Sequence, residues 1–164
     1  MALNLLLSLF GILVICKNVQ ADCPNGFTRH DDSCYKAIRI RATWAESTVY
    51  CHMFGSELTS IETELENRFV IGMLQNMKGS FNPVKFWLGG SDMAEEGSWV
   101  WAKSGQPLTY TNWQHGNPDN GNDGDEHCMD LREDHHWQWG DNNCDEHFYF
   151  VCERPLFVGQ TVIG

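Results

Sequence analysis

The side chains best suited to chemistry are oxygen-bearing groups crowded into one short stretch of the chain. Within ten residues these are Asn117, Asp119, Asn120, Asn122, Asp123, Asp125 and Glu126. Asp141 follows them, and Asp92 and Glu96 precede them. Carboxylate and amide oxygens without thiolates suit a hard cation, and calcium suits them best. The residue types therefore predict a calcium site, with a solvated acidic loop as the alternative.

One window of this stretch has the length of an EF-hand loop but not its chemistry. The window runs from Asp119 to Asp130. Its third place is Gly121, its twelfth is aspartate instead of glutamate, and Cys128 lies inside it. An EF-hand is therefore excluded.

Two helices are predicted before the acidic stretch. Thr43 followed by Glu46 is a capping-box pattern, and Gly55 ends the run that begins there. Thr63 followed by Glu66 repeats the start signal. One face of each helix is expected to pack on the core through Trp44, Val49 and Phe54 in the first helix and Leu65, Phe69, Met73 and Leu74 in the second.

Strands are predicted on both sides of these helices. Residues 22–40 indicate a hairpin, 86–89 and 99–101 indicate short buried strands, and 148–152 indicate a final strand. Residues 107–143 have little regular pattern but contain tryptophans and cysteines, which would tie a long ordered loop to the fold. The order of elements predicts a single α+β domain.

The beginning of the chain is typical of an exported protein. Leu3 to Cys16 is apolar, too short to span a bilayer, and is followed by small residues up to Ala21. We therefore expect a signal peptide at 1–21, a domain at 22–154 and a flexible tail at 155–164. Secretion and an extracellular location follow, without a membrane span.

The charge argues against nucleic-acid and anionic-membrane partners. The formal charge of the whole chain is −11, and loss of Lys17 with the leader makes it −12, since −11 − 1 = −12. An acidic protein of this size repels polyanions and attracts cations.

The cysteine count predicts three disulfides. One of the seven cysteines, Cys16, lies in the leader. The other six are Cys23, Cys34, Cys51, Cys128, Cys144 and Cys152. Six cysteines allow fifteen pairings, and their spacing does not choose among them.

Several short motifs, taken in order, resemble the C-type lectin domain. They are Phe86-Trp87-Leu88-Gly89, Asn117-Pro118-Asp119, Glu126-His127-Cys128, Trp139-Gly140-Asp141 and Phe150-Val151-Cys152-Glu153. The resemblance covers about residues 23–153 and is strongest to small secreted invertebrate lectins, in particular one from mollusc shell. It implies two helices packed on small antiparallel sheets with a long calcium-binding loop. It also implies the disulfides Cys23–Cys34, Cys51–Cys152 and Cys128–Cys144.

The resemblance further implies that sugar binds through a calcium ion. The ligands shared by ion and sugar would be Asn117, Asp119, Glu126 and Asp141, with Pro118 in cis. A second, supporting calcium would use Asp92, Glu96, Asn120 and again Glu126. The order Pro118-Asp119 resembles the galactose-type motif more than the mannose-type motif.

Three positions depart from the family pattern. Asn117 is one methylene shorter than the usual glutamate or glutamine. Gly140 replaces an asparagine ligand and leaves its place to water or to Asn142. His127 stands where an acid is common. These departures predict weaker calcium binding than is usual in the family.

We therefore predict a calcium-dependent lectin that binds glycans in recognition such as innate immunity, and expect several copies to associate so that weak sites act together. Two alternatives remain open: an acidic matrix protein that contacts a mineral surface in shell formation, and a lectin-like fold that binds protein without sugar. An enzyme is not expected, because the acids cluster in one loop and no nucleophile or phosphate motif occurs. Near the site, Trp137, His135 and His136 are candidates for stacking on sugar, and the two histidines are a weaker candidate for zinc.

Overall fold

The computed structural model describes residues 22–77, 79 and 85–156. The predicted signal peptide, residues 1–21, and residues 157–164 of the predicted tail lie outside this range. Among the helices of the described residues, none has the length and apolar character to cross a membrane.

Helix α1 (Trp44–Met53) begins at the predicted capping box. The Thr43 hydroxyl accepts the Glu46 backbone N–H, and the Glu46 carboxylate accepts the Thr43 N–H. Its buried residues are Trp44, Ser47 and Cys51. Val49 is 61 % exposed and Phe54 is 41 % exposed, so the predicted apolar face is wrong at these positions. Val49 lies five residues after the first buried residue, about 140° around the helix, and therefore points to solvent.

Helix α2 (Glu64–Asn76) begins after Thr63, whose hydroxyl accepts the Glu66 N–H at 3.2 Å. Its buried residues are Asn67, Val70 and Leu74. Leu65 is exposed, contrary to the prediction, whereas Phe69 and Met73 are partly buried at the edge of the core. The polar Asn67 takes a core position because its Oδ1 accepts the Trp139 indole N–H at 3.2 Å.

The strands form one connected sheet. They are β1 (Thr28–His30), β2 (Ser33–Ala42), β3 (Glu57–Leu58), β4 (Lys85–Ser91), β5 (Val100–Trp101), β6 (Gln106–Pro107), β7 (Cys128–Arg132), β8 (Gln138–Asn142) and β9 (Phe148–Pro155), with a 3-10 turn, η1 (Glu133–His135), between β7 and β8. The main order is β1-β2-β9-β4-β5-β6, with β3 on β9 and the β7–β8 hairpin on β4. The pairs are antiparallel except β4 with β9, which is parallel. The fold is thus the α+β arrangement that the sequence predicts, but the prediction of a loop over 107–143 is wrong from Cys128 onward, where β7, η1 and β8 form.

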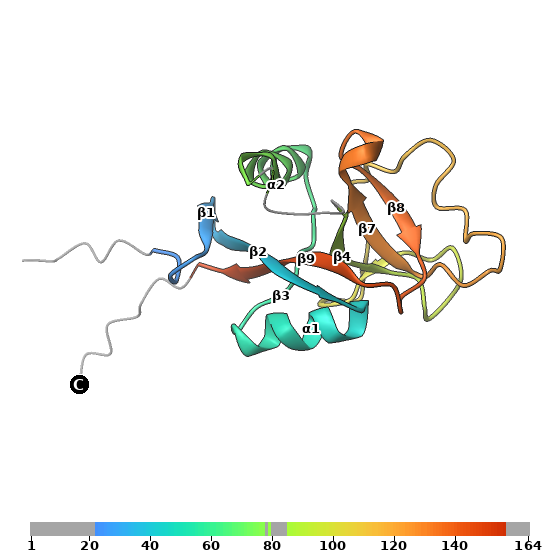
Figure 1. The fold of residues 1–164 in the computed structure, drawn as a ribbon, viewed down its shortest axis with the longest axis horizontal. Helices are drawn as coiled ribbons and strands as arrows, with labels where there is room; N and C mark the ends of the chain where they lie inside the picture. The colour runs from blue at the N-terminus through green and yellow to red at the C-terminus, as the bar shows by residue number, and fades with distance from the viewer. Residues whose placement is uncertain (1–21, 78, 80–84, 157–164) are drawn as a thin grey trace, which may run out of the picture.

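The central strand β9 separates two packed regions. Phe150 and Cys152 face the cluster that includes Trp44 of α1, and Val151 faces the cluster that includes Val70 of α2. Successive strand residues point to opposite faces, so one strand serves both helices. Figure 1 shows α1 and α2 on opposite sides of the β2–β9 ribbon, and the loop between β6 and β7 at the end away from β1.

Three disulfides hold this arrangement, in the pairs that the resemblance implies. Cys23–Cys34 closes the β1–β2 hairpin region, Cys51–Cys152 joins α1 to β9, and Cys128–Cys144 joins the start of β7 to the segment after β8. The second spans 101 positions of sequence. On the chain-entropy account, a closed loop of that size stabilises the fold by about 4.7 kcal/mol.

Candidate metal and carbohydrate site

The long loop between β6 and β7 is fixed at its base to strand β8. Gln114 donates its backbone N–H to the Trp139 carbonyl at 2.8 Å, and Trp139 donates to the Asn112 carbonyl at 2.9 Å. Asn117 donates in turn to the Gln114 carbonyl at 2.9 Å, directly before a cis peptide bond to Pro118. Because Trp139 is fully buried in the core, these hydrogen bonds fix the position of the Asn117-Pro118 segment relative to β8.

Asp141, on β8, holds the long loop in place through its side chain. Its side chain is fully buried, and its Oδ2 accepts the backbone N–H groups of Asp119 at 2.9 Å and Asn120 at 2.6 Å. Its Oδ1 is buried and makes no hydrogen bond within the described part of the chain. A buried carboxylate oxygen without a donor is costly, so this atom fits a metal ligand.

Three carboxylates converge at this point. Asp119, Glu126 and Asp141 each offer an oxygen within 4.8 Å of the others. Asn120 helps to place Glu126, because its Oδ1 accepts the Glu126 N–H at 3.0 Å. Gly121 is required beside them: its φ is 58°, and a Cβ there would lie 2.9 Å from the Glu126 carboxyl carbon. The loop thus gathers side chains that are separated by up to 22 residues.

The converging carboxylates repel one another. Burial raises the pKa of Glu126, and the charges of Asp141 and Asp119 raise it further, while Arg132 acts in the opposite direction. Oxygen-only ligands with an excess of negative charge match the preference of calcium. The residues present therefore fit the ion that the sequence predicts.

Arg132 occupies the place that the missing side chain at residue 140 would take. A Cβ on Gly140 would lie 2.4 Å from the Arg132 Cζ and Nη2 atoms. The guanidinium is held there by the Asp130 carboxylate, at 2.7 Å from Nε, and by the Asp141 carbonyl, at 2.6 Å from Nη2. The Asn142 amide donates to Asp130 instead of filling the gap.

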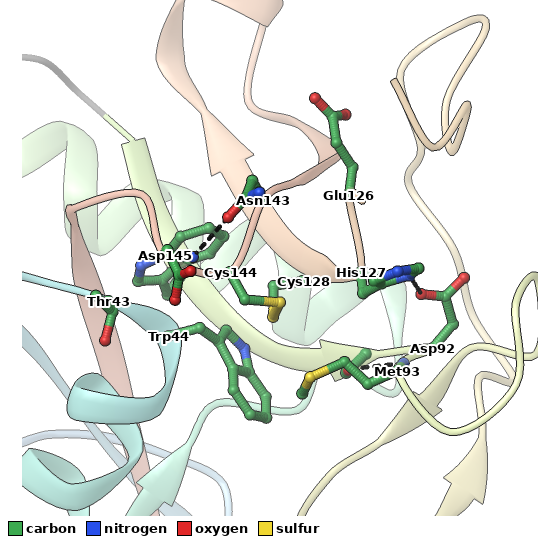
Figure 2. Close-up of a disulfide and its surroundings, with 12 residues drawn as sticks. Thr43, Trp44, Asp92, Met93, Glu126, His127, Cys128, Asn143, Cys144 and Asp145 are labelled. Carbon is green, nitrogen blue, oxygen red and sulfur yellow. Dashed lines mark hydrogen bonds and ion pairs between the residues drawn. A yellow bond between two sulfur atoms is a disulfide. The ribbon is translucent and has the colours of Figure 1, made fainter. Parts of the chain in front are cut away.

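The residues predicted for a supporting calcium fall into two groups. Asp92 and Glu96 lie with His127, whereas Glu126 lies with the Asp119 and Asp141 carboxylates. Glu126 and His127 are adjacent residues directly before β7. Figure 2 shows the Glu126 carboxylate pointing away from the His127 and Asp92 side chains.

Two of the three aromatic and histidine candidates after β7, Trp137 and His135, are engaged in contacts within the fold. Trp137 is only 9 % exposed and stacks with Phe86 in the core. His135 is hydrogen-bonded through Nδ1 to the Gln114 side chain. His136 is exposed, with a left-handed φ of 56°. The groups of potential metal ligands found among the described residues do not include either histidine.

Comparisons with known proteins agree with this architecture. The family profile described as the lectin C-type domain matches residues 40–154. Perlucin of Haliotis laevigata is 38% identical over 133 residues, covering 80% of this chain and 83% of perlucin. The galactose-specific lectin nattectin of Thalassophryne nattereri is 28% identical over 142 residues, covering 87% of this chain and 86% of nattectin. The mouse scavenger receptor C-type lectin carbohydrate-recognition domain has a TM-score of 0.73 at 27% identity, covering 83% of this chain and all of that domain.

The chain belongs to the C-type lectin family. The family that matches is one of lectins rather than enzymes, and the present chain is a perlucin-like member of it.

Proposed function

We propose that this protein is a secreted, calcium-dependent lectin that binds galactose-type sugars at the Asp119–Glu126–Asp141 cluster. The observation that supports it most is the Asp141 carboxylate. One of its oxygens holds the loop through two backbone N–H groups, and its other oxygen is buried without a donor among the described residues, beside two further carboxylates.

The ligands of the ion would be Asp119, Glu126 and Asp141, with Asn117 beside the cis peptide bond as a fourth. Calcium would supply coordination places for two adjacent sugar hydroxyls. The chain itself would orient the sugar, because a carboxylate oxygen not used by the ion accepts a hydroxyl proton and an amide donates its N–H. The same side chains would thus select both the ion and the sugar.

The galactose preference is supported by two observations. Asp119 follows Pro118, which resembles the galactose-type order. A galactose-specific lectin, nattectin, is also among the proteins to which the chain is similar. Because an aspartate only accepts hydrogen bonds where an asparagine also donates, this position affects which hydroxyl pair fits.

Binding at one site is expected to be weak. Arg132 places a positive charge where the family has an asparagine ligand, and this charge opposes a cation held by the neighbouring carboxylates. Association of several copies would compensate through avidity. The signal-peptide pattern at 1–21 and three disulfides support export to an oxidising compartment.

A glycan array tests the proposal when it is run with calcium and again with a chelator. We expect galactose and N-acetylgalactosamine to be bound with calcium only. Glu126→Gln should abolish binding, whereas the exposed Glu146→Gln should not. Binding that persists in chelator, or in Glu126→Gln, would refute the site. If no glycan is bound under either condition, the protein-binding or mineral-surface alternative takes its place.

A further inference from the structure

His127 lies between two carboxylates on the side of the chain opposite Glu126. Its Nδ1 is 3.2 Å from Asp92 Oδ1 and 3.4 Å from Glu96 Oε2. Asp92 and Glu96 lie in the turn after β4, and His127 is the residue before β7. Figure 2 shows the Asp92 carboxylate facing the His127 imidazole. Each offers a ligand atom within 4.8 Å of the others.

The turn after β4 holds Asp92 in a fixed position. Asp92 is 2 % exposed, and its Oδ2 accepts the Gly97 N–H at 2.8 Å. Its backbone carbonyl accepts the Glu95 N–H at 3.0 Å, and its own N–H donates to the His127 carbonyl at 3.3 Å. The remaining oxygen, Oδ1, is therefore directed at the imidazole, and Glu96 lies at the solvent edge of the same turn.

The chemistry of this set differs from that of the carboxylate cluster around Asp141. Calcium takes six to eight oxygen ligands, whereas imidazole nitrogen suits zinc and its neighbours in the periodic table. Ligands of a tetrahedral zinc ion, at about 2.0–2.1 Å from the metal, are about 3.3 Å from one another. The His127 Nδ1 atom lies 3.2 Å from the Asp92 oxygen and 3.4 Å from the Glu96 oxygen, which is close to that edge.

We propose that Asp92, Glu96 and His127 form a binding site for a divalent ion of the zinc class. Two carboxylates and one imidazole hold the metal, and water completes the coordination. The set does not fit the supporting calcium that the sequence resemblance implies, because a nitrogen ligand stands in it and Glu126 faces elsewhere. A zinc-class ion here joins the turn after β4 to the residue next to Glu126. If the proposed lectin site is correct, a zinc ion bound to His127 also restricts the motion of the neighbouring Glu126, which is a ligand of that site.

Titration calorimetry on the metal-free protein tests the site, with zinc chloride alone and calcium chloride alone as probes. We expect His127→Ala to lower zinc affinity by at least about tenfold, since loss of even an indirect metal contact costs 10–100-fold. Glu96→Gln, which changes an exposed side chain, should also weaken zinc binding without affecting the fold. His127→Asp should lose zinc and gain calcium, because it makes the set oxygen-only.

Two further variants separate this site from its alternatives. His136→Asn removes an exposed histidine at a left-handed position that asparagine tolerates, and it should leave zinc binding unchanged. Glu126→Gln should abolish calcium-dependent sugar binding yet keep the zinc site, so failure of one proposal is distinguishable from failure of the other. The inference is overturned if the wild-type protein binds no zinc, or if both His127→Ala and Glu96→Gln bind it as the wild type does. In that case the three side chains form an ion pair and no more.

Discussion

The Arg132 guanidinium lies against the Cα of Gly140, 2.4 Å from where a side chain would begin. The register of β7 and β8 causes this contact, since Asp130 pairs with Gly140 and Arg132 with Gln138. Arg132 can therefore reach back across the glycine to the Asp130 carboxylate. The position of the missing side chain at Gly140, which was expected to be left to water or Asn142, is occupied by the positively charged guanidinium of Arg132. Because this charge repels calcium, weak calcium binding is expected even though the carboxylates converge.

Substitution of Gly140 by alanine should destabilise the fold by about 1–3 kcal/mol, the usual range for overpacking. The flexible end of Arg132 cannot move aside freely, because it is bonded to Asp130 and to the Asp141 carbonyl. Gly72→Ala is the matched control: it lies in α2 with open space around the added methyl, and should stabilise by about 0.5–1 kcal/mol. Urea unfolding of both variants measures the difference, and equal effects would contradict the packing argument.

Removal of Arg132 should cost much more than removal of an exposed arginine. Asp130 is fully buried, and Arg132→Ala leaves its charge without its main partner, which costs about 3–5 kcal/mol. Arg68→Ala breaks an exposed pair with Glu64 and should change stability by no more than about 0.5 kcal/mol. Denaturant unfolding at neutral pH compares the two, and a small loss in Arg132→Ala would mean that Asn142 alone satisfies Asp130.

The stability deficit of Arg132→Ala should shrink in mild acid. Burial raises the pKa of Asp130 above its usual 3.8, and Arg132 opposes the rise. A carboxyl with a raised folded pKa contributes stability below its unfolded pKa and loses it as pH rises through the folded pKa. Without Arg132 this pKa rises further, so the deficit relative to wild type should be smaller at pH 5 than at pH 7. Arg68→Ala should show no such trend.

Calcium should raise the melting temperature by binding the native state. At a free concentration of 100 times Kd the stabilisation is about 2.7 kcal/mol. Asp141→Asn keeps an oxygen for the Asp119 and Asn120 N–H groups but removes the charged ligand, and should abolish the shift. Asp134→Asn changes an exposed carboxylate outside the cluster and should retain it. Differential scanning calorimetry with and without calcium decides, and a wild-type midpoint indifferent to calcium would contradict the prediction.

The calcium-induced shift should decrease as pH falls. The raised pKa of Glu126 means that protons compete with the ion at a higher pH than for an ordinary glutamate. In metal-free protein the same raised pKa contributes stability below the usual 4.5 that is lost as pH rises. Acid therefore favours the metal-free form and disfavours the calcium form. Melting temperatures of metal-free and calcium-loaded protein at pH 7, 6 and 5 should converge, and a constant gap would argue against Glu126 as a ligand.

Asp119→Asn should shift the sugar preference from galactose towards mannose. The change replaces an acceptor with a side chain that also donates, which alters the hydroxyl pair that fits. It also removes one of three carboxylates, so calcium affinity should fall. Glycan binding at saturating calcium separates the two effects. An unchanged galactose-to-mannose ratio would show that position 119 does not set specificity.

The caps, the cysteines and the ordered motifs could be predicted from the sequence, because each is a local pattern. Thr43 with Glu46 marks a helix start in any context, and six cysteines in an exported domain indicate three disulfides. The buried faces of the helices could not be assigned in this way. Ser47 and Asn67 are buried while Val49 and Leu65 are exposed, because the packing against β9 and its neighbours decides which side of each helix is covered.

The sequence by itself also determined which residue types would hold a cation and that Gly140 and His127 break the expected pattern. What those departures mean was decided only by the tertiary structure. Strand register brings Arg132 over Gly140, and the side chains of the neighbours Glu126 and His127 point away from each other into separate clusters (Figure 2). A sequence pattern gives the order of the ligands along the chain but not the direction in which each side chain points. That direction separates the oxygen cluster around Asp141 from the second cluster, which contains the His127 imidazole.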